Sequence, residues 1–189
     1  MNKIDINKIA SSGYLVYVIV ALVIVLDQLT KNIVKSSMFL YQSVNVIGDF
    51  FKLTYIENPG MAFGIQFESK LLFTILSVLA AIIVFIYLVR MPNEKLLFRI
   101  SLALIFGGAI GNLIDRLLYG RVVDFLDVEF FDIALPAFSF LFWDFPGYTM
   151  TRWPVFNIAD SAVTCGMVLL TWLILFQKSA VNQEVTTEA

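Results

Sequence analysis

Histidine is missing from this sequence, and cysteine occurs only once, at Cys165. Zinc sites built on imidazole, Ser-His-Asp triads and Cys-His pairs are therefore excluded, and so is a disulfide within the chain. Charged residues make up only 15% of the chain, and the formal net charge of −2 provides no basic surface for nucleic acid. Catalysis by the chain's own side chains must therefore use carboxylates, amides or hydroxyls. We expect neither a metal nor another cofactor.

Apolar residues are abundant instead, at 59% of the sequence, and they are concentrated in four long runs. A membrane-spanning helix needs about 20 mostly apolar residues. A soluble four-helix bundle would need charged outer faces, and these runs have none. We therefore predict an all-α membrane protein with a single integral membrane domain over residues 1–189. The predicted spans cover residues 9–29, 70–90, 96–118 and 156–177, and the polar tail, residues 179–189, is expected to lack fixed structure.

Four spans place both termini on the same side of the membrane. The connection between the second and third runs is short and carries Arg90, Lys95 and Arg99, so the positive-inside rule favours a cytoplasmic N-terminus and C-terminus. A cleaved signal peptide would have a shorter apolar core and a small-residue cleavage site. The first run is followed by Asp27 and Gln28 instead, and we interpret it as a retained span.

Two connections on the outer side have a recognisable character. Residues 44–56 are rich in β-branched and aromatic side chains and are interrupted by Gly48 and Asp49, which predicts a short β-hairpin. The second, residues 130–152, contains an aromatic stretch (130–148) with two prolines and a glycine, so it cannot form a spanning helix. Aromatic side chains favour the headgroup layer of a bilayer. We therefore predict an aromatic interfacial loop that governs entry to a site.

Four carboxylates emerge on the outer side if the runs cross the membrane in alternating directions: Asp27, Asp115, Asp124 and Asp160. Ionisable residues at membrane depth are costly and mark functional sites. Asp124 and Asp160 suit a proteolytic dyad, in which an ionised carboxylate activates water and a neutral one donates a proton to the scissile carbonyl. On spacing alone, an ion- or proton-conducting site is an alternative, and Asn157 with Asp160 also fits a simple helix N-terminus.

Five short motifs that contain these carboxylates occur in order along the chain. They are Asp27-Gln28-Leu29-Thr30-Lys31, Asn58-Pro59-Gly60-Met61-Ala62-Phe63-Gly64, Gly108-Ala109-Ile110-Gly111-Asn112-Leu113-Ile114-Asp115-Arg116, Val122-Val123-Asp124-Phe125 and Phe156-Asn157-Ile158-Ala159-Asp160-Ser161. Together they resemble the motifs of bacterial lipoprotein signal peptidase, also called signal peptidase II. Any single motif is weak, whereas five in this order, across all four predicted spans, are highly specific.

The resemblance implies an intramembrane aspartic endopeptidase of the bacterial inner membrane, with its active site near the periplasmic face and a small periplasmic β-cradle. Such an enzyme removes the signal peptide of prolipoproteins just before a cysteine that carries diacylglycerol, and globomycin inhibits it. Its expected partners are therefore diacylated prolipoproteins and membrane lipid, with no nucleic acid, and we expect a monomer. The alternatives are a small transporter and an assembly factor whose carboxylates only fix helix ends.

Carried over by motif, the resemblance assigns the catalytic dyad to Asp124 and Asp160. It also implies a supporting set of residues around the site, in which amides hold substrate backbone or orient a carboxylate. The chain between the two aspartates is longer than expected for the family because of the aromatic stretch, so the shape of that loop cannot be inherited. The supporting residues are Asp27, Asn58, Gly60, Asn112, Asp115, Arg116 and Asn157.

Overall fold

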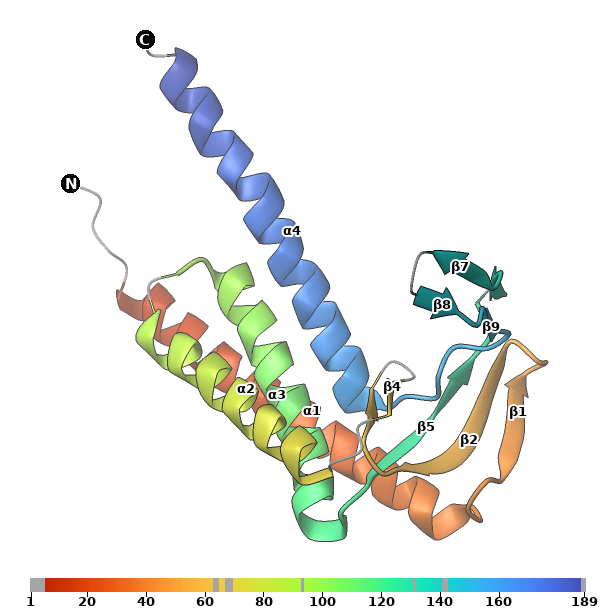
Figure 1. The fold of residues 1–189 in the computed structure, drawn as a ribbon. Coiled ribbons are helices and arrows are strands. Elements are labelled where there is room, and N and C mark those ends of the chain that lie inside the picture. Colours follow the sequence, from red (N-terminus) through yellow and green to blue (C-terminus); the bar gives the residue numbers. More distant parts are fainter. Residues whose placement is uncertain are drawn as a thin grey trace.

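The computed structural model describes residues 6–62, 65–66, 70–92, 94–130, 132–140 and 143–187. Within these residues, four helices are long and apolar enough to cross a membrane, which confirms the four-helix prediction. The start of α1 and the end of α4 lie at the same end of the helices, away from the sheet (Figure 1). The helices are α1 (Ile6–Ser37), α2 (Lys70–Arg90), α3 (Leu96–Tyr119) and α4 (Ile158–Thr187).

Two helices extend well beyond the apolar runs that predicted them. Helix α1 continues past residue 29 to Ser37, and Asp27 and Lys31, one turn apart, form an ion pair within it at 2.8 Å. Helix α4 continues to Thr187, so the expectation of an unstructured tail is wrong over residues 179–187. Neither glycine nor proline occurs there to stop the helix. Residues 188–189 lie outside the described residues.

Helix α3 is central and packs against each of the other three helices. Glycines on α3 allow this packing. A Cβ atom at Gly108 would collide with the carbonyl oxygen of Ala159, and one at Gly111 would lie 2.7 Å from Oδ2 of Asp27 and 3.2 Å from Cβ of Ala159. The small residues therefore bring α1, α3 and the first turn of α4 into direct contact.

An antiparallel sheet with strand order β1-β2-β5 lies beside one end of the helices (Figure 1). The hairpin predicted over residues 44–56 is present, as β1 (Ser43–Ile47) and β2 (Phe51–Asn58). The third strand, β5 (Val122–Val128), follows α3 directly and pairs with β2. The sheet packs on the last part of α1 through a cluster of Val34, Tyr55, Val123 and Phe125. Strands β3 (Met61–Ala62) and β4 (Ile65–Gln66) form a separate short antiparallel pair.

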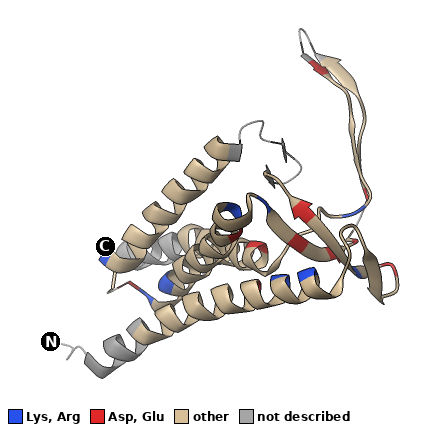
Figure 2. Cartoon of the chain, turned by 90° about the horizontal axis from the view of Figure 1, so that it is seen from below, with Lys and Arg blue, Asp and Glu red and all other residues tan. Residues whose placement is uncertain are grey.

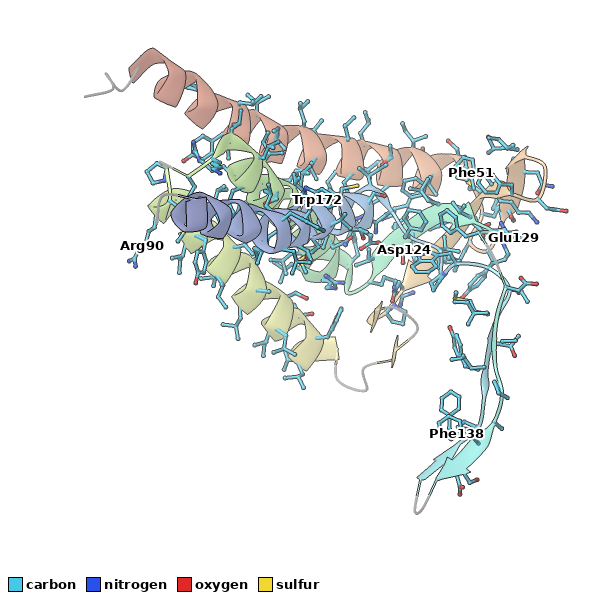
Figure 3. All side chains as sticks on the ribbon, turned by 90° about the horizontal axis from the view of Figure 1, so that it is seen from above. Phe51, Arg90, Asp124, Glu129, Phe138 and Trp172 are labelled. Carbon is cyan, nitrogen blue, oxygen red and sulfur yellow. The ribbon has the colours of Figure 1, made fainter. Side chains whose placement is uncertain are left out.

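The aromatic stretch forms a long, narrow hairpin, which we call the arm (described residues 132–140 and 143–150). Strand β6 (Ile133–Leu135) pairs with β9 (Tyr148–Met150), and β7 (Phe138–Phe140) pairs with β8 (Trp143–Phe145). In Figure 3 the arm runs away from the helices, with Phe138 near its far end and Asp124 inside the body. The placement of the arm at a membrane surface stays a prediction, and Phe131, Leu141 and Phe142 lie outside the described residues.

After the arm, the chain returns to the sheet before α4 begins. The backbone N–H of Trp153 donates to the carbonyl of Val128 at 3.1 Å. Phe156 and Leu126 then exchange two backbone hydrogen bonds, at 3.0 and 2.7 Å. This return aligns the segment before α4 with the middle of β5. The chain length between Asp124 and Asp160 therefore does not separate them.

Candidate active site

Asp124 is buried in β5, with only 2% of its surface exposed. Its carboxylate accepts two hydrogen bonds from amide side chains. Asn157 Nδ2 lies 2.7 Å from Oδ1, and Asn58 Nδ2 lies 3.1 Å from Oδ2. These two amides come from opposite directions, one preceding α4 and the other ending β2, so they fix the plane of the carboxylate.

Asp160 lies in the first turn of α4 and is half-buried. It forms a reciprocal pair with Asn157: the Asp160 N–H donates to Asn157 Oδ1 at 2.9 Å, and the Asn157 N–H donates to Asp160 Oδ2 at 3.2 Å. This is the geometry of a capped helix N-terminus, so the capping interpretation is confirmed. Capping uses only one oxygen of the Asp160 carboxylate. The other, Oδ1, accepts a hydrogen bond from Asn112 Nδ2 at 2.7 Å.

Asn157 is the residue that brings the two aspartates together. It is fully buried and contacts both carboxylates, and its Nδ2 also donates to Oδ1 of Asn112 at 3.0 Å. Burial, together with the nearby charge of Asp160, raises the pKa of the Asp124 carboxyl to about 7. Asp124 is thus partly protonated near neutral pH while its neighbour is reachable from solvent. Such an arrangement can hold one proton between two carboxyl groups.

Behind the asparagines lies a buried ion cluster centred on Lys31, a residue that sequence reasoning did not place in the site. Lys31 is 2% exposed, and its ammonium lies 2.8 Å from Asp27, 3.0 Å from Asp115 and 3.0 Å from Oδ1 of Asn112. Gln28, also missed, donates to Asp27, Asp115 and the Gly111 carbonyl at 3.0–3.1 Å. The only sequence signal for Gln28 and Lys31 was their spacing in the motif Asp27-Gln28-x-x-Lys31, since residues three and four apart lie on one face of a helix.

The two carboxylates of this cluster also hold the backbone next to each dyad residue. Asp27 Oδ1 accepts the N–H of Ala159, which precedes Asp160, at 3.0 Å. Asp115 Oδ2 accepts the N–H of Val123, which precedes Asp124, at 3.2 Å. Asp115 therefore fixes the start of the strand that carries Asp124, and its ion-pair partner is Lys31.

Arg116 and Gly60 take up different positions around the site. The guanidinium of Arg116 lies over the Phe73 ring, 4.6 Å from its centre, within electrostatic range of both Asp124 and Asp160. Gly60 donates its N–H to Asn58 Oδ1 at 3.0 Å and has φ of +138°, a conformation that only glycine adopts readily. Glycine is required there by the backbone conformation and not by lack of space, since the nearest atom to a Cβ at Gly60 would be 3.9 Å away.

All nine residues predicted for the site belong to this region, with the dyad, Asn58, Asn112 and Asn157 in one hydrogen-bonded chain and Asp27 and Asp115 directly behind it. Within the residues that the structure describes, no three His, Cys, Asp or Glu side chains are grouped as metal ligands. The absence of a cofactor stays a prediction.

Known proteins share this sequence and fold. The lipoprotein signal peptidase of Moorella thermoacetica is 39% identical over 163 residues, covering 86% of this chain and 94% of the relative. That of Pelodictyon phaeoclathratiforme is 43% identical over 159 residues, covering 82% and 87%. A solved structure of a bacterial membrane enzyme superposes with a TM-score of 0.69 at 30% identity, covering 88% of this chain and 90% of the other. The signal peptidase (SPase) II family model matches residues 19–176. The chain therefore belongs to the signal peptidase II family of membrane proteases.

Proposed function

We propose that this protease removes the signal peptide of diacylglyceryl-modified prolipoproteins, cutting just before the lipidated cysteine, with Asp124 and Asp160 as a catalytic dyad. Membership of the family gives cleavage of lipoprotein signal peptides. The observation that carries the dyad is the position of Asn157, which bonds to both carboxylates at once. Membership of a protease family, together with this pair, favours a peptidase over a transporter or an assembly factor.

The two carboxyl groups take different roles in the proposed reaction. Asp160, half-buried, is ionised and removes a proton from water, whose oxygen attacks the scissile carbonyl carbon. Asp124, whose pKa is raised to about 7, is protonated and donates to the carbonyl oxygen. The resulting tetrahedral diol collapses when the peptide nitrogen takes up the proton held by Asp160. The C–N bond then breaks, and Asp124 recovers its proton from the diol.

The asparagines supply the order that this step requires. Asn58 and Asn157 hold the Asp124 carboxyl from its two sides, and Asn112 holds Asp160. Fixed donors need no reorganisation as charge moves from one carboxyl to the other, which lowers the barrier. The sheet that carries Asn58 and Asp124 serves in this proposal as the cradle for an extended substrate.

The four helices and the family make the chain a multi-pass membrane protein. We further propose that it lies in the bacterial inner membrane as a monomer, with both termini cytoplasmic and the dyad near the periplasmic face. The arrangement in Figure 2 supports this orientation, since the spans carry few charges and the acidic residues gather at the sheet end. Globomycin, which inhibits the family, is expected to compete with substrate at the dyad.

The decisive experiment is cleavage of a purified prolipoprotein in detergent, followed by mass spectrometry of the new N-terminus. The diacylated precursor should yield a product that begins at the lipidated cysteine, and globomycin should block its formation. A matched precursor without diacylglycerol should remain uncut. Cleavage of both precursors at equal rates would remove the diacylated substrate from the proposal, and no cleavage of either would favour a transporter or an assembly factor.

A further inference from the structure

The outer part of the arm, β7–β8, has two faces of different chemistry. Directly paired residues in an antiparallel ribbon share a face, and residues two apart along a strand do so as well. By register, the positions of the pairs Phe138–Phe145 and Phe140–Trp143 fall on one face of β7–β8, and that of Ser139–Asp144 falls on the other. Strands β6 and β9 form a separate pair nearer the base of the arm.

The aromatic face of β7–β8 is exposed at Phe138, of which 57% is accessible. Among the described side chains, the Phe138 ring contacts that of Phe145, at 5.1 Å between centres. A two-stranded ribbon is marginally stable in water, so an exposed aromatic face of this kind needs something to cover it.

The direction of the arm is fixed at its base by a polar clamp. Arg152 donates to Asp127 Oδ1 at 2.7 Å, to Glu129 Oε2 at 2.5 Å and to the Asp49 carbonyl at 2.8 Å. Trp153 stacks edge-on against Phe130 at 6.1 Å. From this base the arm leaves the body sideways, across the general direction of the helices (Figure 3), and β7 and β8 lie at the level of the helices and not beyond the sheet (Figure 1). The surface beside the helix ends of a multi-pass membrane protein is a bilayer.

We propose that the arm is a membrane-binding element, whose aromatic face enters the headgroup layer of the bilayer beside the helices while Ser139 and Asp144 face water. The proposal concerns lipid alone and does not depend on the dyad or on the substrate. No Lys or Arg occurs between Arg121 and Arg152, so attraction to anionic lipid makes no contribution. The arm should therefore bind uncharged, zwitterionic phospholipid through its aromatic residues, independently of salt.

Tryptophan fluorescence of the full-length protein in phosphatidylcholine nanodiscs tests this proposal. Trp153→Phe and Trp172→Phe leave Trp143 as the single reporter, at a register position on the aromatic face. Its emission should be quenched severalfold more by phosphatidylcholine brominated near the headgroup than by aqueous iodide. The matched control adds Trp143→Phe and Ser139→Trp, which moves the reporter to the polar face, and should show the opposite order. Replacing part of the lipid with phosphatidylglycerol should change neither result.

Two results would overturn the proposal. Strong iodide quenching of Trp143 would place the aromatic face in water, and protection from both quenchers would mean that protein covers it, either a second copy or a bound substrate. Hydroxyl-radical oxidation of the unmodified chain in the same nanodiscs gives a readout that needs no substitution. Phe138 should be oxidised severalfold less than Phe39, which is 85% exposed in the loop after α1. Equal oxidation contradicts the proposal.

Discussion

The ammonium of Lys31 lies 3.0 Å from the amide oxygen of Asn112, and this contact determines which end of Asn112 faces Asp160. An ammonium can only donate, so Oδ1 must point to Lys31 and Nδ2 must point away from it. That Nδ2 lies 2.7 Å from Asp160 Oδ1. Oδ1 of Asn112 also accepts a hydrogen bond from Nδ2 of Asn157, whose orientation towards Asp124 is fixed in turn. A single buried cation thus sets the hydrogen-bond polarity along the whole dyad.

Loss of Lys31 should consequently affect both folding and turnover. Lys31→Met leaves Asp27 and Asp115 buried without a cation, which costs about 3–5 kcal/mol. In the fraction that folds, kcat should fall more than KM rises, because the asparagines lose their orientation. Thermal unfolding in detergent and cleavage kinetics give the two quantities. Lys52→Met is the matched control: its ion-pair partner Asp49 is 78% exposed, and the variant should leave both the unfolding temperature and the kinetics nearly unchanged. Normal turnover by a stably folded Lys31→Met enzyme would contradict this role.

The dyad should behave as a unit under substitution. Asp124→Asn and Asp160→Asn should each lower the rate of prolipoprotein cleavage on the order of 10⁴-fold, and the double variant should be little worse than either, since residues that act together are non-additive. Asp144→Asn, on the exposed polar face of the arm, is the control and should retain full activity. Retained cleavage in either single variant at normal membrane levels would rule out the dyad.

Stability should depend on pH through Asp124. Its pKa rises from 3.8 to about 7 on folding, so the folded protein binds more protons than the unfolded chain between these values. The contribution of Asp124 to the free energy of unfolding is therefore fully present below about pH 4 and is lost as the pH rises through about 7. Asp124→Asn removes this dependence. The difference in Tm between the variant and the unsubstituted protein should grow in favour of the variant from pH 5 to pH 8. Parallel Tm curves would contradict the raised pKa.

Catalysis should follow the same ionisation. Activity should fall on the alkaline side as Asp124 loses its proton, and on the acidic side as the pair takes up a second one, with both apparent pKa values belonging to the pair. A pH–rate profile of cleavage in detergent measures both limbs. A profile that follows one isolated carboxyl group would argue against a shared proton.

Shortening the arm should weaken binding and spare chemistry. Replacing residues 132–150 by a short Gly-Ser turn leaves the Arg152 clamp and the backbone bonds from Trp153 and Phe156 in place. Asp124 and Asp160 therefore keep their partners, and cleavage should persist at saturating substrate. KM and the globomycin concentration for half-inhibition should rise. Complete loss of turnover with normal inhibitor binding would instead make the arm part of the catalytic machinery.

Much of the architecture could be predicted because it depends on local composition. The four apolar runs predicted four helices, and the β-branched residues around Gly48 and Asp49 predicted the first hairpin. The site residues were gathered by motif and converge in the structure. Strand β5 was not predicted, because Val122–Val128 has no alternating pattern of its own and pairs with β2 and with Phe156, both distant in sequence.

Lys31 was missed for a related reason. It follows Asp27 at the end of an apolar run, which is typical of a solvated residue beyond a span. Its burial depends on Asn112 and Asp115, which reach it from α3. The helical tail over residues 179–187 was missed because polar composition was taken as a sign of missing structure, although nothing in those residues interrupts a helix.

The backbone bonds at the base of the arm have a practical consequence for engineering. Trp153 is hydrogen-bonded to Val128, and Phe156 to Leu126. The length of the chain between Val128 and Trp153 therefore does not change the positions of Asp124 and Asp160. The tip of the arm is therefore a permissive insertion site. A fluorescent domain or an epitope grafted there could report on the enzyme in living membranes while the interior of the protein stays unaltered.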